Sequence, residues 1–163
     1  MTPEEKKEHL KNDPSIVHSI LAHSYFIYFW PVILGLILDM VFPGLTFTGR
    51  NFQLIGIFVI FVSSMLIYWA QTTSKKNKNT VNPDGDREFA IGPYKYTRNP
   101  TYTGLMIMTL GLGLVMGSYF IFVFGAIVFI INKMILIPKE ERVLEIKYGN
   151  TYSQYKKKVK SIL

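Results

Sequence analysis

The residues best suited to hold a charged ligand are gathered in the polar stretch from Gly92 to Gly104. Lys95 and Arg98 supply cations, and three tyrosines supply aromatic faces. Asn99-Pro100 indicates the start of a helix, because Asn is a favoured N-cap residue and Pro is favoured at the first helical position. A helix that begins in a basic loop presents unpaired N–H groups to an anion. The stretch therefore predicts a binding site at a helix N-terminus.

A second polar cluster, Glu140-Glu141, follows an apolar run whose only charge is Lys133. That run extends from Thr101 to Ile137 and is long enough to cross a bilayer twice, at roughly 20 residues a crossing. Gly117-Ser118 near its middle predicts a tight turn. A helical hairpin would bring the two carboxylates next to the polar stretch, so the two clusters are expected to form one pocket that faces both water and lipid. Interface anchoring by tyrosines and basic side chains is the plain alternative for these residues.

Apolar runs dominate the rest of this 163-residue chain, which is 49% hydrophobic. The segment Tyr25–Phe42 carries only Asp39, and Phe52–Ala70 carries no charge. Together with the hairpin these runs predict an all-α polytopic membrane protein, in which residues 1–163 form a single membrane domain. Its four transmembrane helices are expected at about 25–42, 52–71, 100–116 and 119–137.

The distribution of the net charge of +7 along the chain indicates a membrane topology rather than a surface that binds nucleic acid. Three of the 18 Lys and Arg residues precede the first span, six lie between the second and third, and eight follow Ile131. Only Arg50 lies in the loop after the first span. Because basic residues favour the cytoplasmic side, residues 1–23, the loop 72–99 and the tail 138–163 are expected there, together with both termini. Membrane lipids are the expected partners of this charge, and nucleic acid is not.

Several classes of chemistry are disfavoured. The chain has no cysteine, which excludes disulfides and thiol catalysis. His18 and His23 are five residues apart, a poor spacing for one helix face, so no metal site is predicted. The charged beginning and the long first apolar run do not match a cleavable signal peptide.

The polar loop and tail carry further structural signals. Asn82-Pro83-Asp84-Gly85 is a strong turn motif, and a connection of about 28 residues favours a functional loop over a passive one. After Pro138, a cytoplasmic helix is expected to begin at Lys139 and to break at Tyr148-Gly149-Asn150. The final segment places Tyr152 and Tyr155 at helical spacing among lysines, which predicts an amphipathic helix lying on the membrane surface.

The order of these motifs resembles one superfamily of integral membrane enzymes. The pattern is Gly92-Pro-Tyr, Arg98-Asn-Pro-Xaa-Tyr-Xaa-Gly and, about 35 residues later, Glu140-Glu with Leu144, Tyr148-Gly, Tyr152 and Tyr155. It resembles the isoprenylcysteine carboxyl methyltransferase and phospholipid methyltransferase group, over roughly Asn82 to the C-terminus. The first two spans match only as generic apolar segments.

The resemblance implies S-adenosylmethionine as the methyl donor, bound without a Rossmann domain. By position, its contacts would come from Arg87, Glu88, Phe89, Tyr94, Asn99, Pro100, Thr101, Tyr102 and Glu140. Eukaryotic members have His where this chain has Asn99. Asn cannot titrate near neutral pH, so a general base at this position is disfavoured.

The chemistry of that donor suggests individual roles. Glu140 would hold its amino group, Arg98 or helix N–H groups its carboxylate, and aromatic faces such as Tyr94 or Tyr102 its sulfonium. Phe89 is a candidate to contact adenine. Glu141 is either a structural partner of Arg98 or Arg142, or, like Tyr102, the base that an amine acceptor requires.

The predicted catalytic residues are Arg98, Tyr102 and Glu141. Asn132 and Lys133 are predicted to bind the acceptor, since polar groups inside a membrane tend to be functional; Lys133 could equally extend to the membrane surface. The expected function is methyl transfer to a lipophilic small molecule or lipid, with the acceptor atom left open between oxygen, sulfur and nitrogen.

Two alternatives stay open. One is an NADPH-dependent membrane reductase of the sterol or steroid type, which shares a similar C-terminal region but usually has more spans. The other is a lipid-binding membrane protein without turnover. The short form and the Arg-Asn-Pro variant resemble prokaryotic members, so prenylcysteine is not expected as the acceptor.

Overall fold

The computed structural model describes residues 15–79 and 88–161, with side chains described for 26–77 and 88–161. Over these ranges the chain is helical, without β-strands, which confirms the all-α prediction. The elements are α2 (Ser15–Val41), η1 (Pro43–Leu45), α3 (Arg50–Asn79), η2 (Gly92–Lys95), α4 (Pro100–Met116), α5 (Tyr119–Ile131), η3 (Asn132–Leu136) and α6 (Ile137–Lys158).

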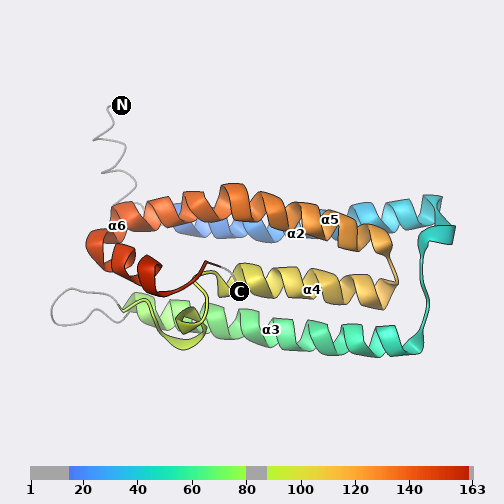
Figure 1. Ribbon diagram of the computed structural model, residues 1–163, viewed down its shortest axis with the longest axis horizontal. Coiled ribbons are helices and arrows are strands. Elements are labelled where there is room, and N and C mark those ends of the chain that lie inside the picture. The colour runs from blue at the N-terminus through green and yellow to red at the C-terminus, as the bar shows by residue number, and fades with distance from the viewer. Residues whose placement is uncertain (1–14, 80–87, 162–163) are drawn as a thin grey trace.

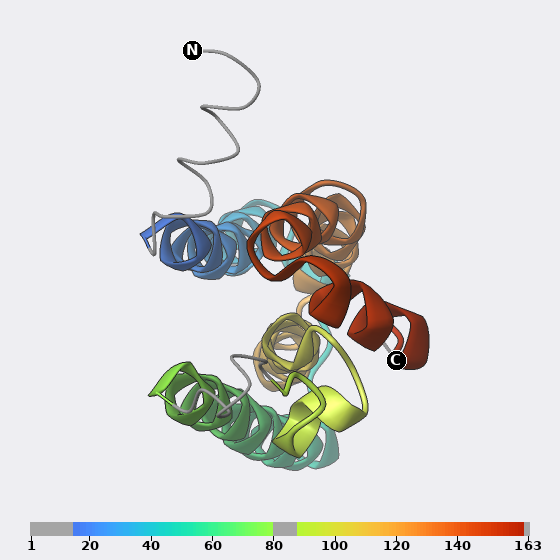
Figure 2. The same cartoon turned by 90° about the vertical axis from the view of Figure 1, so that its left-hand side faces the viewer.

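The long helices form two layers that run along the same axis (Figure 1). α5, η3 and the first part of α6 make one continuous rod beside α2, while α3 and α4 form the second layer. Seen end-on, the last part of α6 descends from the rod towards the loop that precedes α4 (Figure 2). The loop 88–99 and the C-terminal segment therefore meet at one end of the bundle.

Two helices in the described part of the chain are long and apolar enough to cross a membrane, Arg50–Asn77 and Tyr119–Lys158. Phe26–Val41 and Pro100–Met116 are shorter apolar helices. Large hydrophobic side chains such as Phe58 and Met65 are exposed on the outside of α3. A continuous apolar exterior of this kind is typical of a surface that contacts lipid or another protein.

Small residues let α3 and α4 pack backbone to backbone. A Cβ atom at Gly56 would lie 2.7 Å from the carbonyl oxygen of Gly111, and one at Gly111 would lie 3.1 Å from the carbonyl oxygen of Gly56. Close approach at small residues is the usual packing mode between membrane helices. The glycines at these two positions therefore allow α3 and α4 to come into close contact.

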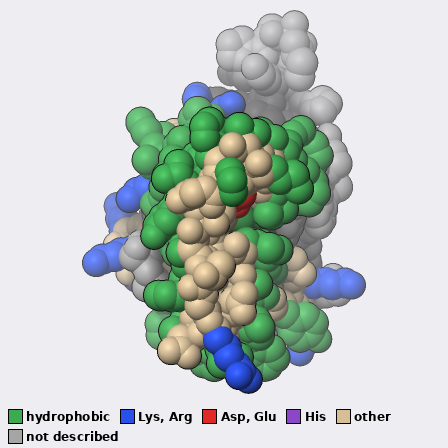
Figure 3. Space-filling model, turned by 90° about the vertical axis from the view of Figure 1, so that its right-hand side faces the viewer, with side chains coloured by type: hydrophobic (Ala, Val, Ile, Leu, Met, Phe, Trp, Pro, Cys, Tyr) green, Lys and Arg blue, Asp and Glu red, His purple; other side chains and the backbone are tan. Residues whose placement is uncertain are grey.

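The turn between α4 and α5 is tight, as predicted. Gly117 adopts a left-handed conformation (φ 66°), and the Ser118 hydroxyl accepts a hydrogen bond from the N–H of Ile121. Phe47 N–H donates to the Gly117 carbonyl, which ties the α2–α3 loop to the turn. Figure 3 looks onto this end of the molecule, where hydrophobic side chains predominate.

Helix limits differ from prediction in the second apolar segment. The sequence predicted a span of 52–71 followed by a polar loop, but α3 continues to Asn79. Lys, Asn and Thr are tolerated in helices, and the predicted turn at 82–85 lies beyond this point, outside the described residues. The N-terminal segment 1–14 and Arg87 also lie outside them.

The predicted end of the fourth helix at Pro138 is wrong, because the rod continues through it. A π turn at Asn132–Leu136 precedes the proline, closed by a hydrogen bond from Ile137 N–H to the Asn132 carbonyl. A proline inside a regular helix removes a hydrogen bond and clashes with the preceding turn; the locally wider π turn offers a way to accommodate it.

The π turn also keeps the same side of the rod buried before and after it. The buried positions advance by 4, 3 and 4 residues up to Asn132 and then by 5 and 4, at Ile121, Gly125, Val128, Asn132, Ile137 and Glu141. The single step of five coincides with the π turn. The inserted residue thus keeps Glu141 on the face that packs against the bundle.

Candidate functional site

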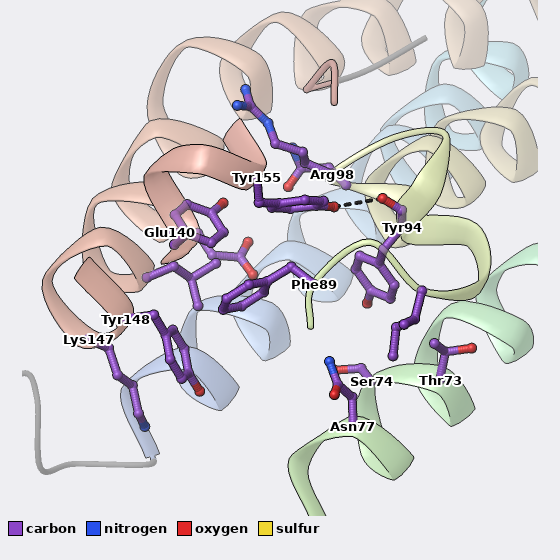
Figure 4. Close-up of a pocket in the computed structure, with 14 residues that line it drawn as sticks. Thr73, Ser74, Asn77, Phe89, Tyr94, Arg98, Glu140, Lys147, Tyr148 and Tyr155 are labelled. Carbon is purple, nitrogen blue, oxygen red and sulfur yellow. Dashed lines mark hydrogen bonds between the residues drawn. The ribbon is translucent and has the colours of Figure 1, made fainter. Parts of the chain in front are cut away.

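A cavity of about 380 Å³ opens where the loop 88–99 and α6 meet the end of α3 (Figure 4). Its size falls within the range of ordinary small-molecule sites. The lining side chains come from three regions of the chain: Thr73, Ser74, Asn77, Phe89, Ile91, Tyr94, Arg98, Asn99, Glu140, Leu144, Lys147, Tyr148, Tyr152 and Tyr155.

Two contacts tie the loop 88–99 to α3. Asn77 Nδ2 donates to the Glu88 carbonyl over 2.7 Å, and the Tyr94 hydroxyl approaches the Ala70 carbonyl at 3.4 Å. Gly92 has a positive φ of 50° and lies against Thr73, so a side chain there would be strained and crowded. The extension of α3 beyond its predicted limit thus forms one wall of the cavity.

Phe89 is the centre of an aromatic cluster. Its ring lies 5.0 Å from Tyr148 and 5.2 Å from Tyr152 in edge-to-face arrangements, and 5.6 Å from Tyr155 in a stacked one. Such pairs add roughly 0.5–1.5 kcal/mol beyond area burial. The cluster joins the loop to both parts of α6.

The C-terminal segment folds back over the site after a break at Gly149, where φ is 55° and ψ is −128°. The predicted break is confirmed. The segment was expected to lie on the membrane surface through its tyrosines, but Tyr152 and Tyr155 are only 2% and 7% exposed. Their contacts with Phe89 bury them inside the protein, and burial raises the pKa of both hydroxyls above the usual value. The Tyr155 hydroxyl donates to the Tyr94 carbonyl over 2.8 Å (Figure 4).

Asn99 is an N-cap by position, yet its side chain does not cap α4. Its amide nitrogen instead donates to the carbonyl and the hydroxyl of Ser161, at 2.9 and 3.0 Å. Thr97 donates to the same carbonyl, and Arg98 N–H donates to the Lys160 carbonyl. Asn99 is thus the N-cap residue by position, as predicted, but its side chain makes no cap hydrogen bond, and its amide nitrogen instead fastens the C-terminal segment.

Arg98 is engaged by α6. Its Nη2 atom lies 3.0 Å from Glu141, and Nη1 donates to the Lys156 carbonyl. Lys156 in turn bridges Glu141 and Glu145, at 3.1 and 2.9 Å, and these hydrogen bonds raise the pKa of its ammonium group. Of the two roles predicted for Glu141, the structure shows the contact with Arg98.

Glu140 has a different environment from its neighbour. Its Oε2 atom is buried, and the Tyr102 hydroxyl is its hydrogen-bonding neighbour. Desolvation by burial raises the pKa of this carboxyl to about 7; the adjacent Tyr102 hydroxyl lowers the value and the charge of Glu141 raises it. A half-neutralised carboxyl at the edge of a cavity is able to bind a cation or accept a proton.

Other predicted cofactor contacts do not line the cavity. Pro100, Thr101 and Tyr102 are buried, and Tyr102 belongs to the central hydrophobic cluster with Tyr28 and Leu105. Glu88 is exposed, and its carbonyl is bound by Asn77.

The two residues predicted to bind the acceptor lie in different environments. Asn132 is completely buried inside the bundle, whereas Lys133 is exposed. The exposure of Lys133 agrees with the alternative of an outward-reaching side chain. The described residues contain no cluster of three His, Asp or Glu side chains able to hold a metal.

Sequence reasoning missed the α3 contribution and Lys147. Thr73, Ser74 and Asn77 carried no signal because their helix was expected to have ended. Tyr148, Tyr152 and Tyr155 belong to the same sequence motif as the Glu pair. Their fixed distance along the chain from Glu140-Glu141 is the signal that could have assigned them to the site.

The family comparison covers most of this site. Residues 51–151 match the sequence model of the phospholipid methyltransferase family, a span that includes α3, the loop, the hairpin and the Glu pair. No curated protein matches the chain. Because the matched span exceeds half of the sequence and contains the cavity's principal walls, the chain belongs to the phospholipid methyltransferase family.

Proposed function

We propose that the protein is an integral membrane methyltransferase that uses S-adenosylmethionine and binds it in the cavity between α3, the loop 88–99 and α6. The observation that carries the proposal is the Glu140 carboxyl, which lies in the wall of an aromatic-lined cavity beside the Tyr102 hydroxyl. Membership of a methyltransferase family supports it.

The residues present fit the charged parts of this donor. Glu140 would hold its ammonium group by a charge-assisted hydrogen bond. The Nε–H of Arg98, which makes no hydrogen bond within the described part of the chain, and the Lys147 ammonium are the candidates for its carboxylate. Phe89 and Tyr148 offer aromatic faces for adenine or for the sulfonium. Bound there, S-adenosylmethionine would supply a methyl group on a sulfonium centre.

The protein's contribution to catalysis is mainly orientation and exclusion of water. The C-terminal segment covers the cavity with Tyr155, and the loop 88–99 closes it from the opposite side. If the acceptor is an amine it must lose a proton, and Glu141 is a poor base because Arg98 and Lys156 already bind it.

The distribution of charge and the exposure of apolar side chains support a membrane arrangement for the proposed enzyme. Helices α2, α3 and α4, together with the α5 rod, would each cross the bilayer, with both termini and the cavity on the cytoplasmic side. Exposed apolar side chains on α2 and α3 support this placement. The donor would then enter from water and a lipophilic acceptor from the bilayer.

The test is calorimetric titration of the purified protein with S-adenosylhomocysteine, the stable product of the donor. Micromolar binding is expected for the unaltered protein and a loss of at least tenfold for Glu140→Gln. The matched control is Glu145→Gln, the same change on the same helix at a residue that does not line the cavity. Binding of NADPH in place of S-adenosylhomocysteine, or equal affinity in the three proteins, would overturn the proposal.

A further inference from the structure

The C-terminal segment, residues 150–161, carries two kinds of lysine. Lys156 is paired with Glu141 and Glu145. Lys157, Lys158 and Lys160 are exposed, and none of the ion pairs formed within the described part of the chain includes them. The segment itself has no Asp or Glu. It therefore presents three uncompensated positive charges to its surroundings.

The opposite side of the segment covers the cavity of the proposed function. Tyr152 and Tyr155 line this cavity and pack against Phe89. The segment is joined to the rest of α6 at Gly149, which has a positive φ of 55°, and a Cβ atom there would meet no other atom within 4 Å. Hinges are typically a few residues at the end of an element that take up a change in φ and ψ. Movement about Gly149 would carry both tyrosines away from the cavity.

The end of the segment is fixed at the level where α4 begins. The Ser161 carbonyl accepts hydrogen bonds from Asn99 Nδ2 and from the Thr97 hydroxyl, over 2.9 and 2.8 Å, and Asn99 directly precedes α4. In the proposed membrane arrangement, α4 enters the bilayer at this point. The neighbouring Tyr96 is 68% exposed, which is typical of a tyrosine at the interface between lipid and water. Seen along the bundle axis, the last part of α6 extends sideways past α4 (Figure 2), so its lysines would lie over the surrounding lipid headgroups.

The chemistry of these lysines selects the partner. A lysine ammonium is a compact charge on a flexible stem and needs no fixed geometry in its anion. Basic residues on the cytoplasmic side of a membrane helix are attracted by anionic lipid headgroups. We propose that Lys157, Lys158 and Lys160 bind the anionic headgroups of the cytoplasmic leaflet and thereby hold the C-terminal segment closed over the cavity. The inference rests on the proposed function, because it makes the affinity of that cavity depend on the charge of the membrane.

The first measurement follows closure without any cofactor. The protein is placed in nanodiscs of dioleoyl phosphatidylcholine, alone or mixed with dioleoyl phosphatidylglycerol, and amide hydrogen exchange of residues 150–161 is measured by mass spectrometry. Exchange should be roughly fivefold slower in the anionic discs, and high salt should remove the difference by screening. The triple variant Lys157→Gln, Lys158→Gln, Lys160→Gln should exchange at the same rate in both discs.

The second measurement is the affinity for S-adenosylhomocysteine by calorimetric titration in the same discs. This ligand carries one ammonium and one carboxylate, so the surface potential does not itself concentrate it. The Kd of the unaltered protein should be roughly fivefold lower in the anionic discs. The Kd of the triple variant should not depend on the lipid.

The matched control removes three exposed lysines outside the segment, Lys75→Gln, Lys133→Gln and Lys139→Gln. It has the same net charge as the first triple variant and should keep both differences. Equal exchange of the segment in the two discs, or a difference that survives the first triple variant or disappears in the control, would overturn the inference. Slower exchange with an unchanged Kd would overturn the link between membrane charge and the cavity. Slower exchange in anionic discs without any binding of S-adenosylhomocysteine would instead overturn the proposed function and support the contact with the membrane.

Discussion

Arg98 Nη2 and Glu141 Oε1 lie 3.0 Å apart, and this ion pair joins the loop before α4 to α6. Both side chains are less than 10% exposed, at 9% and 8%. The pair draws together the two sequence motifs on which the site depends. The two adjacent glutamates therefore have different environments: Glu141 forms the ion pair, and Glu140 lines the cavity.

Replacement of Glu141 should therefore affect stability first. Glu141→Gln leaves the buried Arg98 guanidinium without its anion, which is expected to cost roughly 3 kcal/mol of unfolding free energy. Thermal unfolding in detergent should show a clear fall in Tm. Glu145→Gln breaks only the partly exposed contact with Lys156 and should change stability by about 1 kcal/mol or less. Equal Tm values for both variants would show that the buried ion pair contributes no more to stability than the partly exposed one.

The pH dependence of ligand binding should follow Glu140. Its pKa of about 7 lies above the ordinary value of 4.5 because of burial, so the carboxyl is mostly neutral at pH 6 and mostly ionised at pH 8. Affinity for S-adenosylhomocysteine, whose ammonium group prefers the ionised carboxyl, should rise through this range. Calorimetric titrations of the unaltered protein and of Glu140→Gln at several pH values test this, and the variant should show a flat profile.

The raised pKa of Glu140 has the opposite effect on the stability of the ligand-free protein, which should fall as the pH rises. Between pH 4.5 and about 7 the folded state binds a proton at Glu140 that the unfolded state has released. The contribution of Glu140 to stability is therefore full below pH 4.5 and is lost as the pH rises through about 7. The Tm difference between Glu140→Gln and the unaltered protein should widen in favour of the variant across that window, and a constant difference would contradict the assigned pKa.

The hydroxyl of Tyr155 should matter for closure of the cavity. Tyr155→Phe removes its hydrogen bond to the Tyr94 carbonyl while keeping the ring against Phe89. Titration should show several-fold weaker binding of S-adenosylhomocysteine, which corresponds to a loss of about 1 kcal/mol of binding free energy. Tyr96→Phe is the control, because that side chain is 68% exposed and should have no effect. Unchanged affinity in Tyr155→Phe would mean that the C-terminal segment does not hold the cavity closed.

Deletion of Met134 tests the π turn. This residue is 72% exposed, so its side chain contributes little. Its removal shortens the step from Asn132 to Ile137 from five residues to four, which a regular α-helical turn closes, so Glu140 and Glu141 should keep their orientation. S-adenosylhomocysteine should therefore bind normally to the deletion variant and to Met134→Ala. Loss of binding in the deletion variant alone would show that the π turn itself is needed, and not only the orientation of the residues that follow it.

The sequence predicted the helical hairpin accurately because its signals are local. Asn99-Pro100 and Gly117-Ser118 fix where α4 begins and ends, and both limits agree with the structure. The break at Gly149 was predicted for the same reason and is confirmed. The limits at Asn79 and Pro138 were missed, because a polar stretch without a breaker can remain helical and a π turn has no local sequence signal.

The sequence by itself determined which residue types are available and in which order: two adjacent carboxylates, a Tyr-rich basic loop and the apolar helices. Only the tertiary structure decided how these residues are shared between binding and support. Arg98 and Asn99 hold the C-terminal segment, Glu140 faces the cavity, and Asn132 lies beside Tyr28. The physical reason is that each of these pairings joins residues far apart in the chain, and their choice depends on the one-residue register of the π turn and on how closely α3 and α4 pack.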